Sequence, residues 1–212
     1  MEEKTTRTAP IIGVSRLRMN IDGEGVTTLV GFYGCPLRCK WCINPACFTP
    51  RQAVRMFSPE KLYAQVRQDE LYYLATGGGV TFGGGEPLQF PWFLTEFRKL
   101  CGDAWHLCAE TSLAVPWENV REAAESIDEF IVDCKDTDPN IYLRYTGRSN
   151  DLALENLRKL VALVGAERVL VRVPLIPQYN TEQDCAASEA RLREMGVKRF
   201  DRFAYMLPNE KR

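Results

Sequence analysis

The chain has 212 residues, of which 45% are hydrophobic and 26% charged, a composition typical of one ordinary globular domain. Its 27 basic and 28 acidic residues give a formal net charge of −1, which argues against a nucleic-acid-binding or anionic-membrane surface. The N-terminus has no signal-peptide core, and no apolar run approaches the roughly 18 residues that cross a bilayer, so we expect a cytoplasmic protein.

Segments typical of strands and helices alternate along the chain. The predicted strands cover residues 27–33, 80–82, 105–110, 129–134, 168–173 and 197–205. The predicted helices cover residues 58–69, 91–101, 116–126, 151–164 and 181–195. Ser58 and Pro59 form a helix start, Pro91 and Pro116 open the next two helices, and Pro174 is expected to close the fifth strand.

This alternation predicts a parallel sheet with crossover helices. About six units are fewer than the eight of a TIM barrel, so we predict a single α/β domain over residues 1–212, a partial (β/α)6 TIM-like barrel. Chemistry in such folds sits at the carboxyl ends of the strands. The polar and cysteine residues expected there, and therefore in one site, are Cys35, residues 83–86, Glu110, Thr111, residues 133–135 and Arg172.

Eight cysteines in a cytosolic chain indicate metal binding or catalysis rather than disulfides. Cys35, Cys39 and Cys42 have C-x3-C-x2-C spacing on a predicted loop. Thiolates are the ligands of iron–sulfur clusters, and three of them leave one iron of a [4Fe–4S] cluster free to chelate the amino and carboxylate groups of S-adenosylmethionine (SAM). The alternatives are a structural zinc site with Cys47 as fourth ligand, which lacks the usual distant ligand pair, and incidental buried cysteines.

Together with further segments in a fixed order, this motif resembles the radical SAM superfamily, specifically the glycyl-radical-enzyme activating enzymes of the pyruvate formate-lyase activating type. The resemblance covers nearly the whole chain. The segments that carry it are residues 22–25 (DGEG), 34–45 (GCPLRCKWCINP), 80–88 (VTFGGGEPL), 133–135 (DCK), 145–150 (YTGRSN), 155–157 (ENL) and 172–180 (RVPLIPQYN).

The resemblance implies an anaerobic oxidoreductase in which a [4Fe–4S] cluster reductively cleaves SAM to a 5′-deoxyadenosyl radical. That radical abstracts a Cα hydrogen from a glycine of a partner glycyl radical enzyme. A flavodoxin or ferredoxin-type protein would donate the electron, and the enzyme would act as a monomer. Because Cys47 is solitary, no ferredoxin-like insertion fits, and the chain resembles a compact form.

The resemblance also implies roles for single residues in SAM binding. Gly84, Gly85 and Glu86 would hold the amino group of SAM, although a glycine turn before the next helix is the alternative. Lys135, beside Asp133, would contact the SAM carboxylate, and a surface ion pair is the alternative. The remaining two implied contacts are Arg172 at the methionine group and Trp41 near the adenine, with a solvated arginine and plain packing as alternatives.

A monovalent cation is implied beside the SAM carboxylate, held by Glu110, Thr111 and Asp133, with glutamate where the family has aspartate. Asp22, implied with Lys135 to be catalytic, would face the partner's glycine loop; a turn without function is the alternative.

Three positions depart from the family or from an expected ligand role. Thr27 stands where the family's DGxGxR pattern has arginine, and Met206 where it has a late histidine. The only histidine, His106, lies within a strand pattern and is interpreted as a packed residue.

Two other functions stay open at this point. One is a radical SAM enzyme acting on a small metabolite, similar to 7-carboxy-7-deazaguanine synthase, which also has a GEG turn before its cluster. The other is a non-catalytic iron–sulfur carrier or adaptor, which would need no SAM site. The segments after residue 140 favour the activating enzyme, and the joint presence of Glu86, Asp133, Lys135 and Arg172 argues against the adaptor.

Overall fold

The computed structural model describes residues 7–19, 21–48 and 54–205. The strands are β1 Ala9–Met19, β2 Val26–Phe32, β3 Arg55–Phe57, β4 Gly79–Gly84, β5 His106–Thr111, β6 Glu129–Asp133, β7 Val169–Leu175 and β8 Arg199–Ala204. The α-helices are α1 Pro59–Val66, α2 Glu70–Thr76, α3 Pro91–Cys101, α4 Trp117–Ala124, α5 Pro139–Thr146, α6 Asp151–Val164 and α7 Glu182–Glu194.

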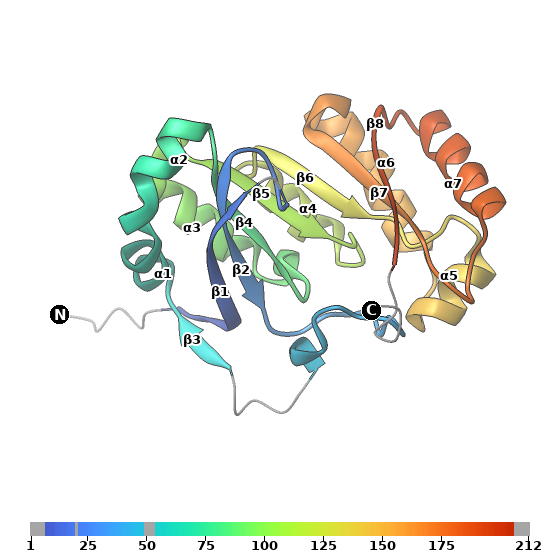
Figure 1. Cartoon of the computed structure of the whole chain (residues 1–212), viewed down its shortest axis with the longest axis horizontal. Helices are drawn as coiled ribbons and strands as arrows, with labels where there is room; N and C mark the ends of the chain where they lie inside the picture. Colours follow the sequence, from blue (N-terminus) through green and yellow to red (C-terminus); the bar gives the residue numbers. More distant parts are fainter. Residues whose placement is uncertain (1–6, 20, 49–53, 206–212) are drawn as a thin grey trace.

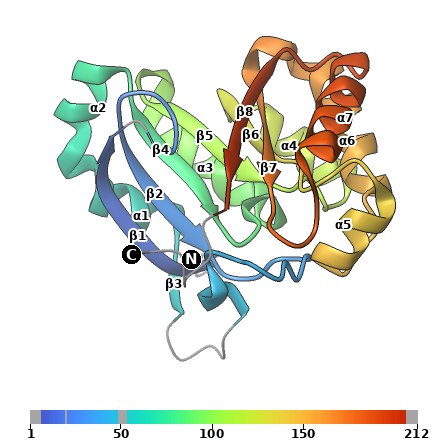
Figure 2. The same ribbon diagram turned by 45° about the vertical axis from the view of Figure 1, so that its right-hand side comes forward.

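All of these strands belong to one sheet, in the order β3-β1-β2-β4-β5-β6-β7-β8. The run from β2 to β8 is parallel throughout. The sheet curves with its helices on the outside, and its edges do not meet (Figures 1 and 2). The predicted partial (β/α)6 barrel is therefore confirmed.

An antiparallel edge precedes the parallel part, and the sequence did not predict it. β1 pairs with β2 and with β3, both antiparallel. Two irregularities interrupt the β1–β2 register, between Ile11 and Gly13 and between Ser15 and Arg18. Only the first residues of β1 are buried, so the alternation of apolar and polar residues that marks a strand is weak there.

Three further boundaries differ from the sequence prediction. The helix expected over residues 58–69 is α1 followed by a 3₁₀ turn, Arg67–Asp69, and then α2. α5 was not predicted. The expectation that Pro174 closes the fifth strand is wrong, because β7 runs to Leu175. Pairing of β7 with β6 ends at Arg172, so the missing N–H of the proline interrupts no bond on that side.

The hydrophobic core lies between the sheet and the outer helices. α3 shows how the sequence builds it: Pro91 occupies the first turn, and Phe93, Leu94 and Phe97 are fully buried against the sheet. The Phe97 ring packs edge-on against Phe82 at 5.4 Å between centroids. Each such side chain stabilises the fold by about 1.5–3 kcal/mol. This packing fixes the strands from outside and leaves their inner face free for a site.

Among the described helices, none has the length and apolar character needed to cross a membrane.

Candidate active site

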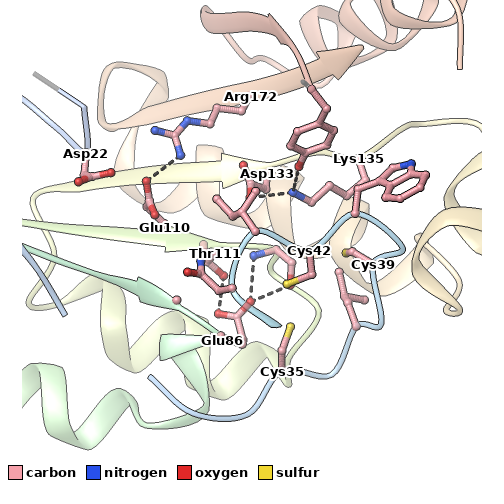
Figure 3. A pocket seen from close by; sticks show the side chains of 18 of the residues that line it. Asp22, Cys35, Cys39, Cys42, Glu86, Glu110, Thr111, Asp133, Lys135 and Arg172 are labelled. Atoms are coloured by element: carbon pink, nitrogen blue, oxygen red, sulfur yellow. Dashed lines mark hydrogen bonds and ion pairs between the residues drawn. The ribbon is translucent and has the colours of Figure 1, made fainter. Parts of the chain in front are cut away.

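A cavity of about 450 Å³ lies on the inner face of the sheet, between the strand ends and the loop that follows β2. It gathers almost every residue that the sequence singled out, although these come from positions spread between residues 22 and 172 (Figure 3). The predicted residues that line it are Asp22, Cys35, Cys39, Trp41, Cys42, Gly84, Gly85, Glu86, Glu110, Thr111, Asp133, Lys135 and Arg172.

The cysteine loop, residues 35–42, is fixed by a distant part of the chain. The backbone N–H of Arg38 donates to Thr146 O at 2.9 Å, and that of Lys40 donates to Tyr145 O at 3.1 Å. These carbonyls end α5, which closes at Gly147 in the left-handed conformation with φ +73°. The tyrosine–threonine–glycine segment thus serves as the support of the cysteine loop, a role the sequence did not reveal.

The three thiols fit a [4Fe–4S] cluster. Cys35, Cys39 and Cys42 are free and line the same cavity. Burial, and secondarily Glu86, raise the pKa of Cys35 to about 12, and burial raises that of Cys39. The raised pKa values mean that Cys35 and Cys39 are protonated thiols without iron, and iron must displace those protons.

Cys47 is placed differently from the three cavity cysteines. It is 2% exposed and does not line the cavity. Burial and the neighbouring Cys42 raise the pKa of Cys47 to about 12. Within the described part of the chain, no three His, Cys, Asp or Glu side chains converge on one metal ion, so the zinc alternative has no ligand set there. A cubane spreads its thiolates over separate irons and does not need that convergence.

The glycine run at the end of β4 packs against the start of the cysteine loop. Gly84 has φ +84°, and a Cβ on it would lie 2.6 Å from Gly31 Cα. A Cβ on Gly85 would lie 2.1 Å from Gly34 O. The two glycines are thus required by the fold, and they also leave bare backbone at the cavity wall. The structural and the ligand-binding interpretations are compatible.

Glu86 is buried and ties the end of β4 to the segment after β5. Its carboxylate accepts hydrogen bonds from Thr111 Oγ1 at 2.7 Å and from both N and Oγ of Ser112, at 2.9 and 2.7 Å. Burial raises the pKa of Glu86, and these hydrogen bonds oppose the rise without cancelling it. Ser112 was not singled out by the sequence.

Lys135 is 8% exposed, and its ammonium group points into the cavity (Figure 3). Nζ lies 2.8 Å from Asp133 Oδ2 and 3.1 Å from Tyr205 Oη. Burial lowers the pKa of Lys135, but Asp133 and Tyr205 outweigh it, and the pKa stands well above its usual value. The ammonium therefore stays charged in the cavity. Tyr205 comes from the residue after β8 and was not predicted.

Arg172 crosses the cavity and forms an ion pair with Glu110, with Nη1 2.7 Å from Oε1. Its Nε also lies 3.4 Å from Asp201 Oδ2. The Thr111 hydroxyl, on the other face of β5, donates to Glu86 instead. The three predicted cation ligands line the same cavity, but Arg172 neutralises Glu110 and Lys135 neutralises Asp133. The residues present do not fit a monovalent cation.

Asp22 lies at the side of the cavity opposite the cysteine loop (Figure 3). Its backbone carbonyl accepts a hydrogen bond from the Thr81 hydroxyl, and its carboxylate forms an ion pair with Arg18. The aspartate is only 5% exposed, so its side chain is part of the cavity wall, whereas the preceding Ile21 is 60% exposed.

Of the other residues considered in the sequence, Trp41 lines the cavity and His106 lies in a strand. The buried Nε1 of Trp41 has no hydrogen-bond partner among the described residues. His106 begins β5 and is half-buried beside Glu129, as a packed residue should be. Met206 lies outside the described residues.

Asparagines from the late segments hold the loops that carry the site. Asn150 Nδ2 donates to Thr137 O at 3.0 Å, and Asn180 Nδ2 to Asp136 Oδ2 at 3.1 Å, both behind the end of β6. Fully buried Asn156 donates from Nδ2 to the carbonyls of Leu113 and Val115, at 2.9 and 2.8 Å. Leu113 has φ +57°, a strained conformation that needs such support.

Replacing Asn156 by alanine is expected to lower the free energy of unfolding by about 2–4 kcal/mol, because two buried carbonyls lose their donor. Urea denaturation measures this. Glu155→Ala, one residue away on an exposed face and paired with Lys159, is the control and should change stability little. Equal losses in the two variants would contradict the supporting role of Asn156.

A family model described as the radical SAM superfamily matches residues 29–186, more than half of the chain. The chain belongs to the radical SAM superfamily. The segment that matches the family model begins in β2, includes the cysteine loop and ends in α7. A [4Fe–4S] cluster and SAM are therefore the cofactors of this radical SAM enzyme.

Curated relatives of this radical SAM enzyme are activating enzymes. The (2S)-3-sulfopropanediol dehydratase activating enzyme of Klebsiella oxytoca is 30% identical, over 89% of this chain and 78% of that protein. The pyruvate formate-lyase-activating enzyme of Staphylococcus aureus is also 30% identical, over 77% of this chain and 67% of that protein. The resemblance to the glycyl-radical-enzyme activating enzymes is confirmed, and the metabolite enzyme and the adaptor are not favoured.

The first of these alignments extends over 251 positions, more than the 212 residues of this chain, so that relative carries segments this enzyme lacks. Among solved structures, Streptococcus suis SuiB bound to its precursor peptide has a TM-score of 0.63 at 16% identity, covering 84% of this chain and 38% of that one. This likeness supports the fold.

Proposed function

We propose that this radical SAM enzyme activates a glycyl radical enzyme by removing a Cα hydrogen from a glycine of that partner. The products are methionine, 5′-deoxyadenosine and a glycyl radical on the partner. The observation that carries the proposal is the cavity itself, which unites three free cysteines with a buried lysine and an arginine. A [4Fe–4S] cluster held by the cysteines supplies the electron that cleaves SAM.

The side chains of the cavity bind and orient SAM. Lys135 is already held by Asp133 and Tyr205, so its ammonium meets the SAM carboxylate without a search through rotamers. The backbone at Gly84 and Gly85 and the carboxylate of Glu86 receive the amino group. Arg172 faces the methionine part, and Trp41 packs near the adenine.

Asp22 faces the partner from the other side of the cavity, where the turn after β1 meets Arg172: Nη2 of Arg172 donates to Ile21 O at 3.3 Å. Residues 1–212 act as one catalytic unit and as a monomer. A flavodoxin or ferredoxin-type protein supplies the electron.

The relatives suggest partners for a direct test. Sulfopropanediol dehydratase, isethionate sulfite-lyase, indoleacetate decarboxylase, choline trimethylamine-lyase and pyruvate formate-lyase are named in the activating enzymes that this chain is similar to. Anaerobic incubation of the cluster-loaded enzyme with SAM, dithionite and each partner should give, with at least one, the doublet electron paramagnetic resonance signal of a glycyl radical.

Deuterium at the glycine Cα of that partner should appear in 5′-deoxyadenosine. The control is a partner variant in which the radical glycine is alanine, which should give neither the signal nor the label. If none of the partners responds, while a small metabolite stimulates SAM cleavage and loses the hydrogen itself, the activating function is refuted.

A further inference from the structure

The turn between β1 and β2 carries a buried ion pair that the cofactor site does not use. Arg18 on β1 donates from Nε to Asp22 Oδ2 and from Nη2 to Oδ1, the second bond at 3.3 Å. The Asp22 side chain is 7% exposed and the Arg18 side chain 29%. Both residues line the cavity. A two-point contact of this kind fixes both the charge and the orientation of a carboxylate.

Asp22 needs such a partner because its surroundings are acidic. Burial raises the pKa of Glu110, and the nearby Asp133 and Asp22 carboxylates raise it further. The Asp22 hydrogen bond raises the pKa of Arg18 most, and Glu110 also raises it. Arg172, a further cation of the cavity, is already paired with Glu110. Keeping a buried carboxylate in the cavity wall without its own counter-charge would be costly.

The pairing of β1 with β2 gives this arginine a particular meaning. Arg18 stands directly opposite Thr27 in the antiparallel ladder, so the two side chains lie on the same face. Thr27 is 2% exposed, and its hydroxyl oxygen is buried with no hydrogen-bond partner among the described residues. Its methyl group borders Gly23, the residue after Asp22.

We propose that Arg18 is a positioning residue that holds the Asp22 carboxylate in the cavity wall, and that an arginine at position 27, directly across the ladder, would hold it in the same way. The part of this inference that concerns partner binding rests on the proposed function, because Asp22 faces the partner.

The experiment exchanges the two positions. Arg18→Ala should raise the half-saturating concentration of the activated partner about 10- to 100-fold, the range for losing a charged hydrogen bond, and lower the maximal rate by much less. In the double variant Arg18→Ala/Thr27→Arg, the half-saturating partner concentration should be at least tenfold lower than in Arg18→Ala. Thr27→Arg alone brings two guanidinium groups together and should not improve on the natural chain.

A second arginine on the same strand provides the matched control. Arg16 forms a bidentate ion pair with Asp69, both contacts at 2.6 Å, and does not line the cavity. Arg16→Ala removes a comparable bond from β1 and should leave the half-saturating partner concentration unchanged. If it raises that concentration as much as Arg18→Ala does, or if Thr27→Arg brings no recovery, Arg18 has a merely structural role and the proposal fails.

A measurement without partner separates this inference from the proposed function. The urea midpoint of the cluster-loaded enzyme should fall in Arg18→Ala, recover in the double variant with Thr27→Arg, and fall much less when Arg18 is removed from an Asp22→Asn background. If no partner is activated but this pattern appears, the proposed function fails and the exchange of positions stands. If partners are activated and the pattern is absent, the exchange is refuted.

Discussion

Replacing Cys35, Cys39 or Cys42 by alanine is expected to abolish loading of the [4Fe–4S] cluster. After anaerobic reconstitution the natural chain should hold about four irons and four sulfides. Each of the three variants should hold almost none, because Cys35, Cys39 and Cys42 are the cysteines that line the cavity, and each of them supplies one ligand. Iron and sulfide assays and the visible absorbance of the cluster measure the loss. SAM cleavage should disappear with it.

Cys47 and Cys101 are the matched controls. Cys47 is buried beside the loop and Cys101 lies at the end of α3, and neither lines the cavity. Cys47→Ala and Cys101→Ala should keep the full iron content. If the cluster is lost in Cys47→Ala and kept in Cys42→Ala, the ligand assignment is wrong. If the protein contains zinc in place of iron and sulfide, the structural zinc site is the correct alternative.

Replacing Lys135 by alanine is expected to weaken SAM binding about 10- to 100-fold, which corresponds to about 1.5–3 kcal/mol for a charge-assisted contact to a carboxylate. Isothermal titration of SAM into the cluster-loaded enzyme measures it. The upward shift in the pKa of Lys135 gives the sign of the pH dependence. A lysine whose folded pKa is raised keeps its charge below that pKa, so this contact should persist through neutral and mildly alkaline pH.

Lys159, paired with Glu155 on the exposed face of α6, is the control for removing a lysine. Lys159→Ala should bind SAM as the natural chain does. If Lys135→Ala keeps its full affinity, the pair of Lys135 with Asp133 is a structural ion pair, and the SAM carboxylate is bound by another group.

The sequence predicted the parallel part of the fold because its signals are local and strong. Pro91 and a run of apolar residues defined α3 to the residue, and the amphipathic pattern from Asp151 defined α6. The sequence did not predict α5, although Asp138 caps it. The helix has only eight residues, and several of them are β-branched or aromatic, with weak helix propensity. The sequence did not predict β1, because its second half is mostly exposed and its register with β2 is irregular.

In the candidate site, the sequence predicted which residues gather but not which of them pair. Strand ends of a parallel sheet meet at one edge, so Glu86, Asp133 and Arg172 could be expected in one cavity from their positions alone. The pairing of Arg172 with Glu110 depends on side-chain reach across two strands, and it neutralises one of the carboxylates expected to bind the cation. The sequence did not single out Tyr205, Ser112 and Arg18, because they belong to no recognised motif. Their importance follows only from the residue that each one contacts.

The support of the cysteine loop by α5 has a consequence for biosynthesis. Arg148 Nε donates to Pro36 O at 3.3 Å across 112 residues, beside the backbone bonds that tie Arg38 and Lys40 to Thr146 and Tyr145. A ribosome releases the cysteines long before the segment that shapes their loop, and such long-range contacts form late in folding. The cysteine loop can therefore reach its observed conformation only after residues 145–148 have been synthesised. We therefore expect iron–sulfur insertion to follow the synthesis of residues 145–148.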